Sequence, residues 1–266
     1  MGKNTRNEIF APATKSFYKV REIRDLKDLM AQTKKLYGDR YAFEIKKRDK
    51  SGMQYITYNE YCSDIDALGT ALIEMGYKDK HIAVSANNRY EWCLSYMSVV
   101  NGVGVIVPID KELLFPDING IFEISETKLL FCDKLLLDTL ERDKMDPEIQ
   151  IVCFDYDEDR DGILSFSKLV AKGKALLAKG DKRFLEAEID PDKMSTLLFT
   201  SGTTGAAKGV MLCHRNFCFE VMSAMSVLKI YPEDCGISML PLHHTYESTI
   251  ILFFAPYCGA KVTFCD

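Results

Sequence analysis

Basic residues are not in excess in this 266-residue sequence. Its 34 lysines and arginines face 39 aspartates and glutamates, which gives a formal net charge of −5. Proteins that grip a nucleic acid backbone need clustered positive charge, so we expect no nucleic acid partner. The N-terminal sequence MGKNTRNEIFAPATKSF lacks the apolar core of a signal peptide, and we expect a cytoplasmic protein. The most apolar long stretch, Met97–Ile109, is too short to span a bilayer, and Asn101, Gly102 and Gly104 interrupt it.

Complete metal-binding patterns are also missing. The nine cysteines include no CxxC pair and lie mostly within apolar runs, where a free cysteine behaves as a small buried hydrophobic residue. Cys213, His214 and Cys218 lack a second pair of zinc ligands. Residues 157–164 match the start of an EF-hand loop, but Lys168 stands where calcium needs a bidentate glutamate. We therefore predict no metal-ligating residues in this sequence.

Short apolar runs alternate with amphipathic segments along most of the chain. The clearest helix start is Thr57–Glu60, where the spacing of a capping box precedes apolar residues at helical intervals up to Met75. Strands separated by helices predict an α/β fold with doubly wound, mostly parallel sheets and helices on both faces. We expect strands at 41–46, 53–56, 81–86, 103–107, 128–132, 150–154, 194–200, 209–213, 236–240 and 261–264. We expect helices at 58–75, 88–101, 116–125, 135–142, 166–179, 216–229 and 245–257.

A polar stretch at 179–193 interrupts this alternation and contains an Asp-Pro-Asp sequence, which is typical of a domain boundary. We predict that residues 1–190 form a first α/β subdomain with an N-terminal helical segment. Residues 191–266 would then begin a second α/β subdomain. No helix follows the last expected strand, so we expect the chain to be part of a longer protein.

The segment most suggestive of chemistry is Thr200–Gly209, TSGTTGAAKG, between two expected strands. Its glycines allow backbone N–H groups to approach an anion, and its hydroxyls can donate to phosphate oxygens. Lys208 adds a positive point charge, so the segment suits a nucleotide triphosphate. It is not the P-loop of NTPases, because Lys208 precedes Gly209 instead of following a glycine and preceding Ser or Thr. Composition alone leaves a plain flexible hairpin loop as the alternative.

The order of residues in FTSGTTGAAKGV resembles the phosphate-binding signature of the adenylate-forming superfamily, which includes acyl-CoA synthetases, luciferases and peptide-synthetase adenylation domains. Ala207 stands where the family usually has proline. The following MLCHRN, the NRYEW at 88–92 and the GVGVIVPID at 102–110 are similar to other family segments, although the last two also fit a plain helix and a buried strand. The resemblance implies that the β- and γ-phosphates are bound by Thr200, Ser201, Gly202, Thr203, Thr204, Gly205 and Lys208.

The sequence LPLHHTYE at 240–247 resembles the LPLxHxxE segment of fatty acyl-CoA synthetases. His244 matches the motif histidine, Glu247 matches the glutamate, and His243 fills the variable place. The resemblance implies catalytic roles for His244 and Glu247 at the acyl and adenylate region. Without the resemblance, a lone histidine is more often structural than catalytic.

The resemblance implies an ATP-dependent acid–CoA ligase, acting on a long-chain fatty acid, that uses ATP, Mg²⁺ and coenzyme A. Its small-molecule substrates react in two steps, through an acyl-adenylate and then a thioester. The family's segments for adenine, ribose and magnesium, and its C-terminal domain, have no match here, so we expect the chain alone to be inactive. Two alternatives stay open: a short non-catalytic nucleotide-binding or regulatory protein, and an adenylating enzyme with a different acceptor. Peripheral membrane contact and self-association also stay open.

Overall fold

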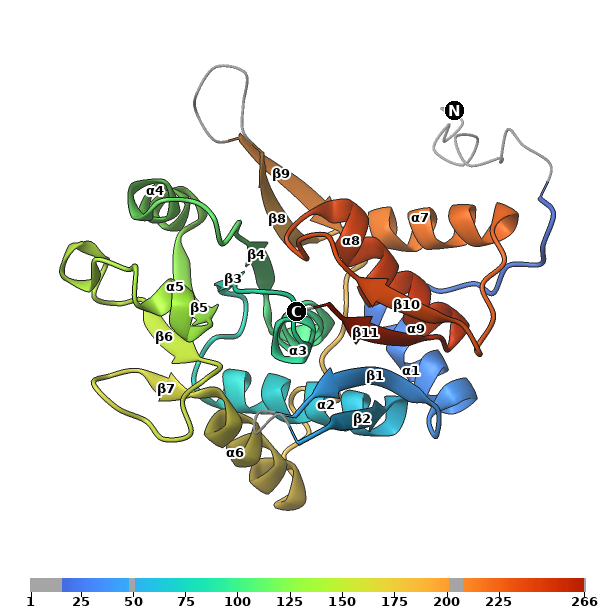
Figure 1. The fold of residues 1–266 in the computed structure, drawn as a ribbon, viewed down its shortest axis with the longest axis horizontal. Helices are drawn as coiled ribbons and strands as arrows, with labels where there is room; N and C mark the ends of the chain where they lie inside the picture. The colour runs from blue at the N-terminus through green and yellow to red at the C-terminus, as the bar shows by residue number, and fades with distance from the viewer. Residues whose placement is uncertain (1–15, 48–50, 201–207, 266) are drawn as a thin grey trace, which may run out of the picture.

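The strands form two sheets in the computed structural model, which describes residues 16–47, 51–200 and 208–265 (Figure 1). The strands are β1 (Tyr41–Lys46), β2 (Met53–Thr57), β3 (His81–Ser85), β4 (Val105–Pro108), β5 (Thr127–Cys132), β6 (Gln150–Cys153), β7 (Leu164–Ser165), β8 (Met194–Thr200), β9 (Lys208–Cys213), β10 (Cys235–Ser238) and β11 (Lys261–Phe264). One sheet has the order β7-β6-β5-β3-β4-β8-β9, and the other β10-β11-β1-β2. Neighbouring strands are parallel except β8–β9 and β1–β2.

Helices cover both faces of the seven-stranded sheet. The α-helices of the described residues are α1 (Leu26–Tyr37), α2 (Tyr58–Glu74), α3 (Tyr90–Ser98), α4 (Phe115–Ser125), α5 (Lys134–Leu137), α6 (Phe166–Ala178), α7 (His214–Val227), α8 (Thr245–Thr249) and α9 (Ala255–Cys258). Along β3, Ile82 and Val84 pack into a core with α2, α3 and α6, whereas Ala83 packs into a second core with α4 and α5. The alternation of side chains along a strand therefore explains the two covered faces. The predicted α/β fold with mostly parallel sheets is confirmed.

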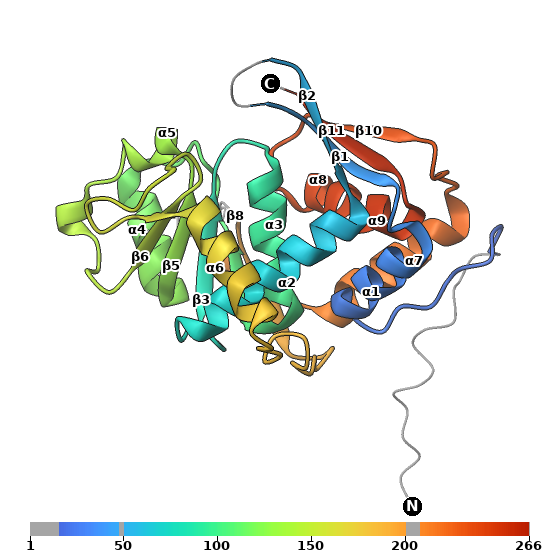
Figure 2. The ribbon, with the colours of Figure 1, turned by 90° about the horizontal axis from the view of Figure 1, so that it is seen from below.

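The larger core also joins the two sheets. It contains Phe43 of β1 and Val262 of β11 together with residues of α1, α2 and α3. Helices α2 and α6 pack against each other, and both lie toward the viewer in Figure 2. The predicted capping box starts α2: the Thr57 hydroxyl accepts from the Glu60 N–H, and the Glu60 carboxylate accepts from the Thr57 N–H. Those two bonds satisfy backbone donors that the helix itself leaves unpaired.

The predicted boundary at residue 190 falls between α6 and β8. Each sheet takes strands from both sides of it, because β1 pairs in parallel with β11, and β4 pairs in parallel with β8. Neither sheet is therefore built from one continuous stretch of the chain. The division into subdomains at this point stays a prediction.

Three predicted helices differ from the structure. The helix expected at 88–101 is α3 followed by a π-helical stretch, Val99–Val103. The helix expected at 135–142 is the single turn of α5, followed by a 3₁₀ turn at Arg142–Lys144, since residues 141–144 are exposed and offer no apolar face to bury. The helix expected at 245–257 contains a π-helical stretch, Ile250–Phe254, between α8 and α9. Within the ranges described, no helix is both long and apolar enough to cross a membrane.

Candidate functional site

The carboxyl ends of the parallel strands meet at one edge of the seven-stranded sheet. Residues 87–89 follow β3, Asp110 follows β4, Asp133 follows β5 and Asp155 follows β6. Strand β8 runs parallel to β4 with Ile106 opposite Thr196, so its last residue, Thr200, reaches the same edge. In open α/β sheets, ligands bind beyond this edge. We therefore take this carboxyl edge as the candidate site.

Two of the predicted phosphate-binding residues lie at the base of the loop. Thr200 ends β8 and is the direct partner of Lys208, which begins the antiparallel strand β9, and both are exposed. Directly paired residues place their side chains on the same face of a sheet, so the hydroxyl and the ammonium group share one side. Five other predicted residues lie outside the described residues: Ser201, Gly202, Thr203, Thr204 and Gly205.

His244 and Glu247 occupy neighbouring but different environments. His244 is exposed and precedes α8 as its N-cap, where Nδ1 accepts from the Tyr246 N–H at 3.4 Å. Glu247 is only 5% exposed, and its Oε1 accepts from the Met239 N–H at 3.0 Å. The imidazole is therefore accessible from solvent, while the carboxylate holds the backbone that follows β10. The catalytic assignments of both residues stay predictions.

The sequence does not indicate which residue His243 faces. Its Nε2 lies 3.6 Å from Oδ2 of Asp110, the residue at the end of the GVGVIVPID segment. Burial lowers the pKa of His243, and Asp110 opposes that shift. The two residues belong to two motifs that the sequence does identify, but nothing in the sequence indicates that the motifs touch.

A second missed residue is Asn88, in the NRYEW segment. Its carboxamide hydrogen-bonds to Ser238, the last residue of β10, and to the chain that follows and leads to His243 and His244. Its neighbour Arg89 bonds to Glu91 at 2.9 Å and to Asp155 at 2.8 Å. Burial opposes the charge of Arg89, but these two carboxylates outweigh it and raise the pKa of the guanidinium group. The segment thus anchors the carboxyl edge as well as forming a helix.

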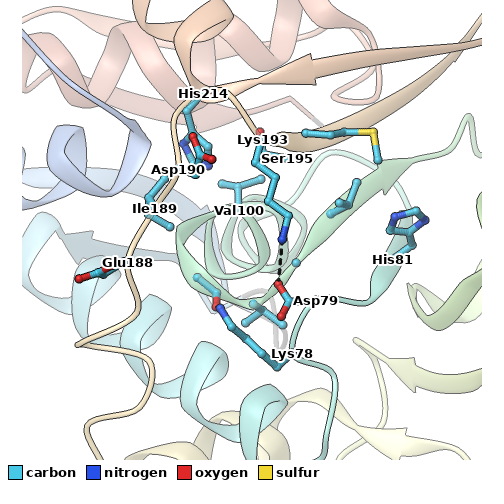
Figure 3. A pocket seen from close by; sticks show the side chains of 15 residues that line it. Lys78, Asp79, His81, Val100, Glu188, Ile189, Asp190, Lys193, Ser195 and His214 are labelled. Carbon is cyan, nitrogen blue, oxygen red and sulfur yellow. Dashed lines mark hydrogen bonds and ion pairs between the residues drawn. The ribbon is translucent and has the colours of Figure 1, made fainter.

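A cavity of about 570 Å³ lies at the opposite edge, where β3, β4 and β8 begin (Figure 3). The ammonium group of Lys193 faces Asp79 across it, with Nζ and Oδ1 3.4 Å apart. His214, from the MLCHRN segment, lines this cavity and not the carboxyl edge. Its Nδ1 accepts from the Leu26 N–H at 3.1 Å, so it secures the start of α1.

Among the residues that the structure describes, no group of three or more His, Cys, Asp or Glu side chains is placed to hold a metal ion. In the segment that matches the start of an EF-hand loop, the Asp159 carboxylate accepts from the Ser165 N–H at 2.7 Å, and Arg160 bridges to Ile163. These contacts close a turn before α6.

The sequence matches known enzymes along most of its length. A model of the AMP-binding enzyme family matches residues 31–266. The chain is 29% identical to fatty acyl-CoA synthetase B of Dictyostelium discoideum, over 94% of this chain and 39% of that protein. It is 30% identical to long-chain-fatty-acid–CoA ligase 1 of Homo sapiens, over 79% of this chain and 32% of that protein. The chain therefore spans well under half of the length of these curated relatives.

Solved structures share the fold. The structure of VinN superposes with a TM-score of 0.72 at 20% identity, covering 92% of this chain and 60% of VinN. The N-terminal subdomain of NpsA from Klebsiella oxytoca gives a TM-score of 0.67 at 16% identity, covering 92% of this chain and 56% of that chain. At these identities the likeness concerns the fold alone.

Proposed function

This chain belongs to the AMP-binding enzyme family, and from that premise we propose that it forms part of an ATP-dependent acid–CoA ligase. The enzyme would activate a long-chain fatty acid as its acyl-adenylate and transfer the acyl group to coenzyme A. The names of the relatives support the fatty acid and the acceptor.

One observation supports the proposal more than any other. The LPLHHTYE segment follows β10 of the four-stranded sheet. The TSGTTG motif begins at Thr200, the last residue of β8 in the seven-stranded sheet. Asn88 and Asp110, which follow β3 and β4, tie the LPLHHTYE segment to the edge where β8 ends. The LPLHHTYE segment and the end of β8, where Thr200 pairs with Lys208, therefore lie at one edge of one sheet.

The first step would be an in-line substitution at phosphorus. A carboxylate oxygen of the acid bonds to the α-phosphorus of ATP, the bond from that phosphorus to the bridging oxygen breaks, and pyrophosphate leaves. Negative charge then grows on the departing phosphates. The Lys208 ammonium group and the Thr200 hydroxyl suit those oxygens, because a fixed positive charge and a donor stabilise charge where it develops. Positioning and charge neutralisation would carry the catalysis.

In the second step the thiol of coenzyme A bonds to the acyl carbon, AMP leaves, and the thiol proton passes to solvent. We propose that the exposed imidazole of His244 lies against the acyl and adenylate groups, with Glu247 holding the turn before it. Mg²⁺ would screen the phosphate charge in such a reaction. The described residues include no group of three or more His, Cys, Asp or Glu side chains placed to hold it.

The test is thioester formation from a fatty acid, ATP and coenzyme A by the full-length protein that contains this chain. Trapping the acyl-adenylate with hydroxylamine separates the two steps. Adenylate without thioester would favour a different acceptor. Nucleotide binding without adenylate would favour the non-catalytic alternative.

We also propose a cytoplasmic location and self-association of the isolated chain. Self-association is supported by large apolar side chains exposed around β9, β10 and α8, among them Met211, Ile237, Met239 and Tyr246. Light scattering after size exclusion would test it: a single species of 30.2 kDa would count against it.

A further inference from the structure

Asn88 links the two sheets through a single carboxamide. Its Nδ2 donates to Oγ of Ser238 at 2.9 Å and to the carbonyl oxygen of Leu240 at 2.6 Å. Its Oδ1 accepts from the Leu242 N–H at 3.0 Å. A carboxamide has two N–H donors and one acceptor oxygen, so all three of its functional groups are engaged by one short segment.

The 238–242 segment has further ties. Ser238 pairs with Phe264 of β11, and its carbonyl oxygen accepts from the Cys265 N–H at 3.1 Å. Glu247, on the same side of the molecule, holds the Met239 N–H, and His243 faces Asp110. Ser238 and Leu242 are 0% and 2% exposed, so water is poorly placed to replace the carboxamide. Without Asn88, the buried Leu242 N–H would have no acceptor, which is costly for a backbone donor.

We propose that Asn88 is a positioning residue of the candidate site. It holds the 238–242 backbone against the carboxyl edge of the seven-stranded sheet and so keeps His244 at the edge where β8 ends. The consequence for catalysis rests on the proposed function, whereas the link between the sheets is a property of this chain alone.

Asparagine suits this position for a chemical reason. Aspartate would keep the acceptor for Leu242 and accept a bond from the Ser238 hydroxyl, but it would lose the bond to the Leu240 carbonyl oxygen and set a negative charge against it. Alanine would lose all three bonds. The two substitutions therefore grade the loss, and Asn119→Ala is a matched control, since Asn119 lies on α4 and bonds to Glu123.

The first experiment measures amide hydrogen exchange in this chain. Loss of one buried hydrogen bond corresponds to about a tenfold change in the equilibrium constant for local opening. In Asn88→Ala the Leu242 amide should therefore exchange about tenfold faster, while the amides of β3 and β5 keep their rates. Asn88→Asp should change Leu242 less, and Asn119→Ala not at all. An unchanged Leu242 rate in Asn88→Ala would overturn the proposal. If Asn88→Ala does not fold, Ser238→Ala removes one of the three bonds, and a rate at Leu242 equal to wild type there would overturn it too.

The second experiment measures adenylate formation in the full-length protein. We expect Asn88→Ala to lower kcat about tenfold with KM for ATP nearly unchanged, and Asn88→Asp to recover part of the loss. An active wild type with an equally active Asn88→Ala would refute the positioning role. An inactive wild type would refute the proposed function instead, and the exchange rates would still decide whether Asn88 holds the segment.

Discussion

His214 should make the free energy of unfolding fall in mild acid. The side chain is 3% exposed, and its Nδ1 accepts from the Leu26 N–H at 3.1 Å. Protonating that nitrogen would turn the acceptor into a donor facing another donor. Burial lowers the pKa of His214 to about 4, with Asp25 and a hydrogen bond to the Val100 backbone opposing the shift.

The direction and size of the effect follow from the two pKa values. An exposed imidazole in the unfolded chain has a pKa of 6.5, so between pH 6.5 and 4 the unfolded state binds the proton that the native state refuses. The contribution of His214 is therefore complete above pH 6.5 and is lost as the pH falls towards 4. With these two values, the loss between pH 7.5 and 5 is ~2 kcal/mol.

Urea unfolding at a series of pH values would measure this loss. The single tryptophan, Trp92, is buried and reports the transition by fluorescence. In His214→Gln, glutamine offers an acceptor and a donor but does not titrate, so the variant removes the pH-dependent part. Wild type should lose ~2 kcal/mol more than the variant between pH 7.5 and 5. Parallel curves for the two proteins would refute the reasoning.

Three further predictions concern packing, capping and the loop. Gly173→Ala in α6 should lower the free energy of unfolding by ~1–3 kcal/mol, because its Cβ would lie 1.8 Å from the Ala67 carbonyl oxygen in α2. Gly120→Ala in α4, where a Cβ meets nothing within 4 Å, should raise it by ~0.5–1 kcal/mol; urea unfolding that shows both changes with the same sign would contradict the packing. Thr57→Ala should lower the free energy of unfolding by ~1 kcal/mol in the same urea experiment, and an unchanged value would mean that the capping box does not stabilise α2. Lys208→Ala should leave stability unchanged and slow adenylate formation by the full-length protein ~10²-fold, whereas an unchanged rate would remove Lys208 from the mechanism.

Local signals in the sequence predict most of the elements because those elements depend on local chemistry. The capping box at Thr57 and the apolar spacing after it predict α2, and the structure confirms both bonds. Strand β7 could not be predicted. It consists of Leu164 and Ser165 only, and its pairing with Val152 and Cys153 of β6, not its own sequence, makes it a strand. Pairing partners of this kind are invisible to a sequence pattern.

The candidate site likewise combines motifs that the sequence indicates with contacts that it does not. The motifs around Asn88, Asp110, Lys208 and His244 can be identified one by one, since each has its own residue order. The contacts of Asn88 and Asp110 with the LPLHHTYE segment cannot, because that segment follows a sheet in which β1 pairs in parallel with β11, and these strands lie far apart in the sequence. That pairing helps to form the four-stranded sheet, from which the LPLHHTYE segment reaches Asn88. The composition change near residue 190 does not indicate the pairing of β1 with β11.

The most direct test of the central claim is the formation of acyl-CoA by the full-length protein that contains this chain. We expect thioester to form only when a long-chain fatty acid, ATP and coenzyme A are all present, with one pyrophosphate released for each thioester, and we expect its rate of formation to decline sharply in Lys208→Ala. ATP binding by a folded protein that releases no pyrophosphate with any fatty acid would contradict the account.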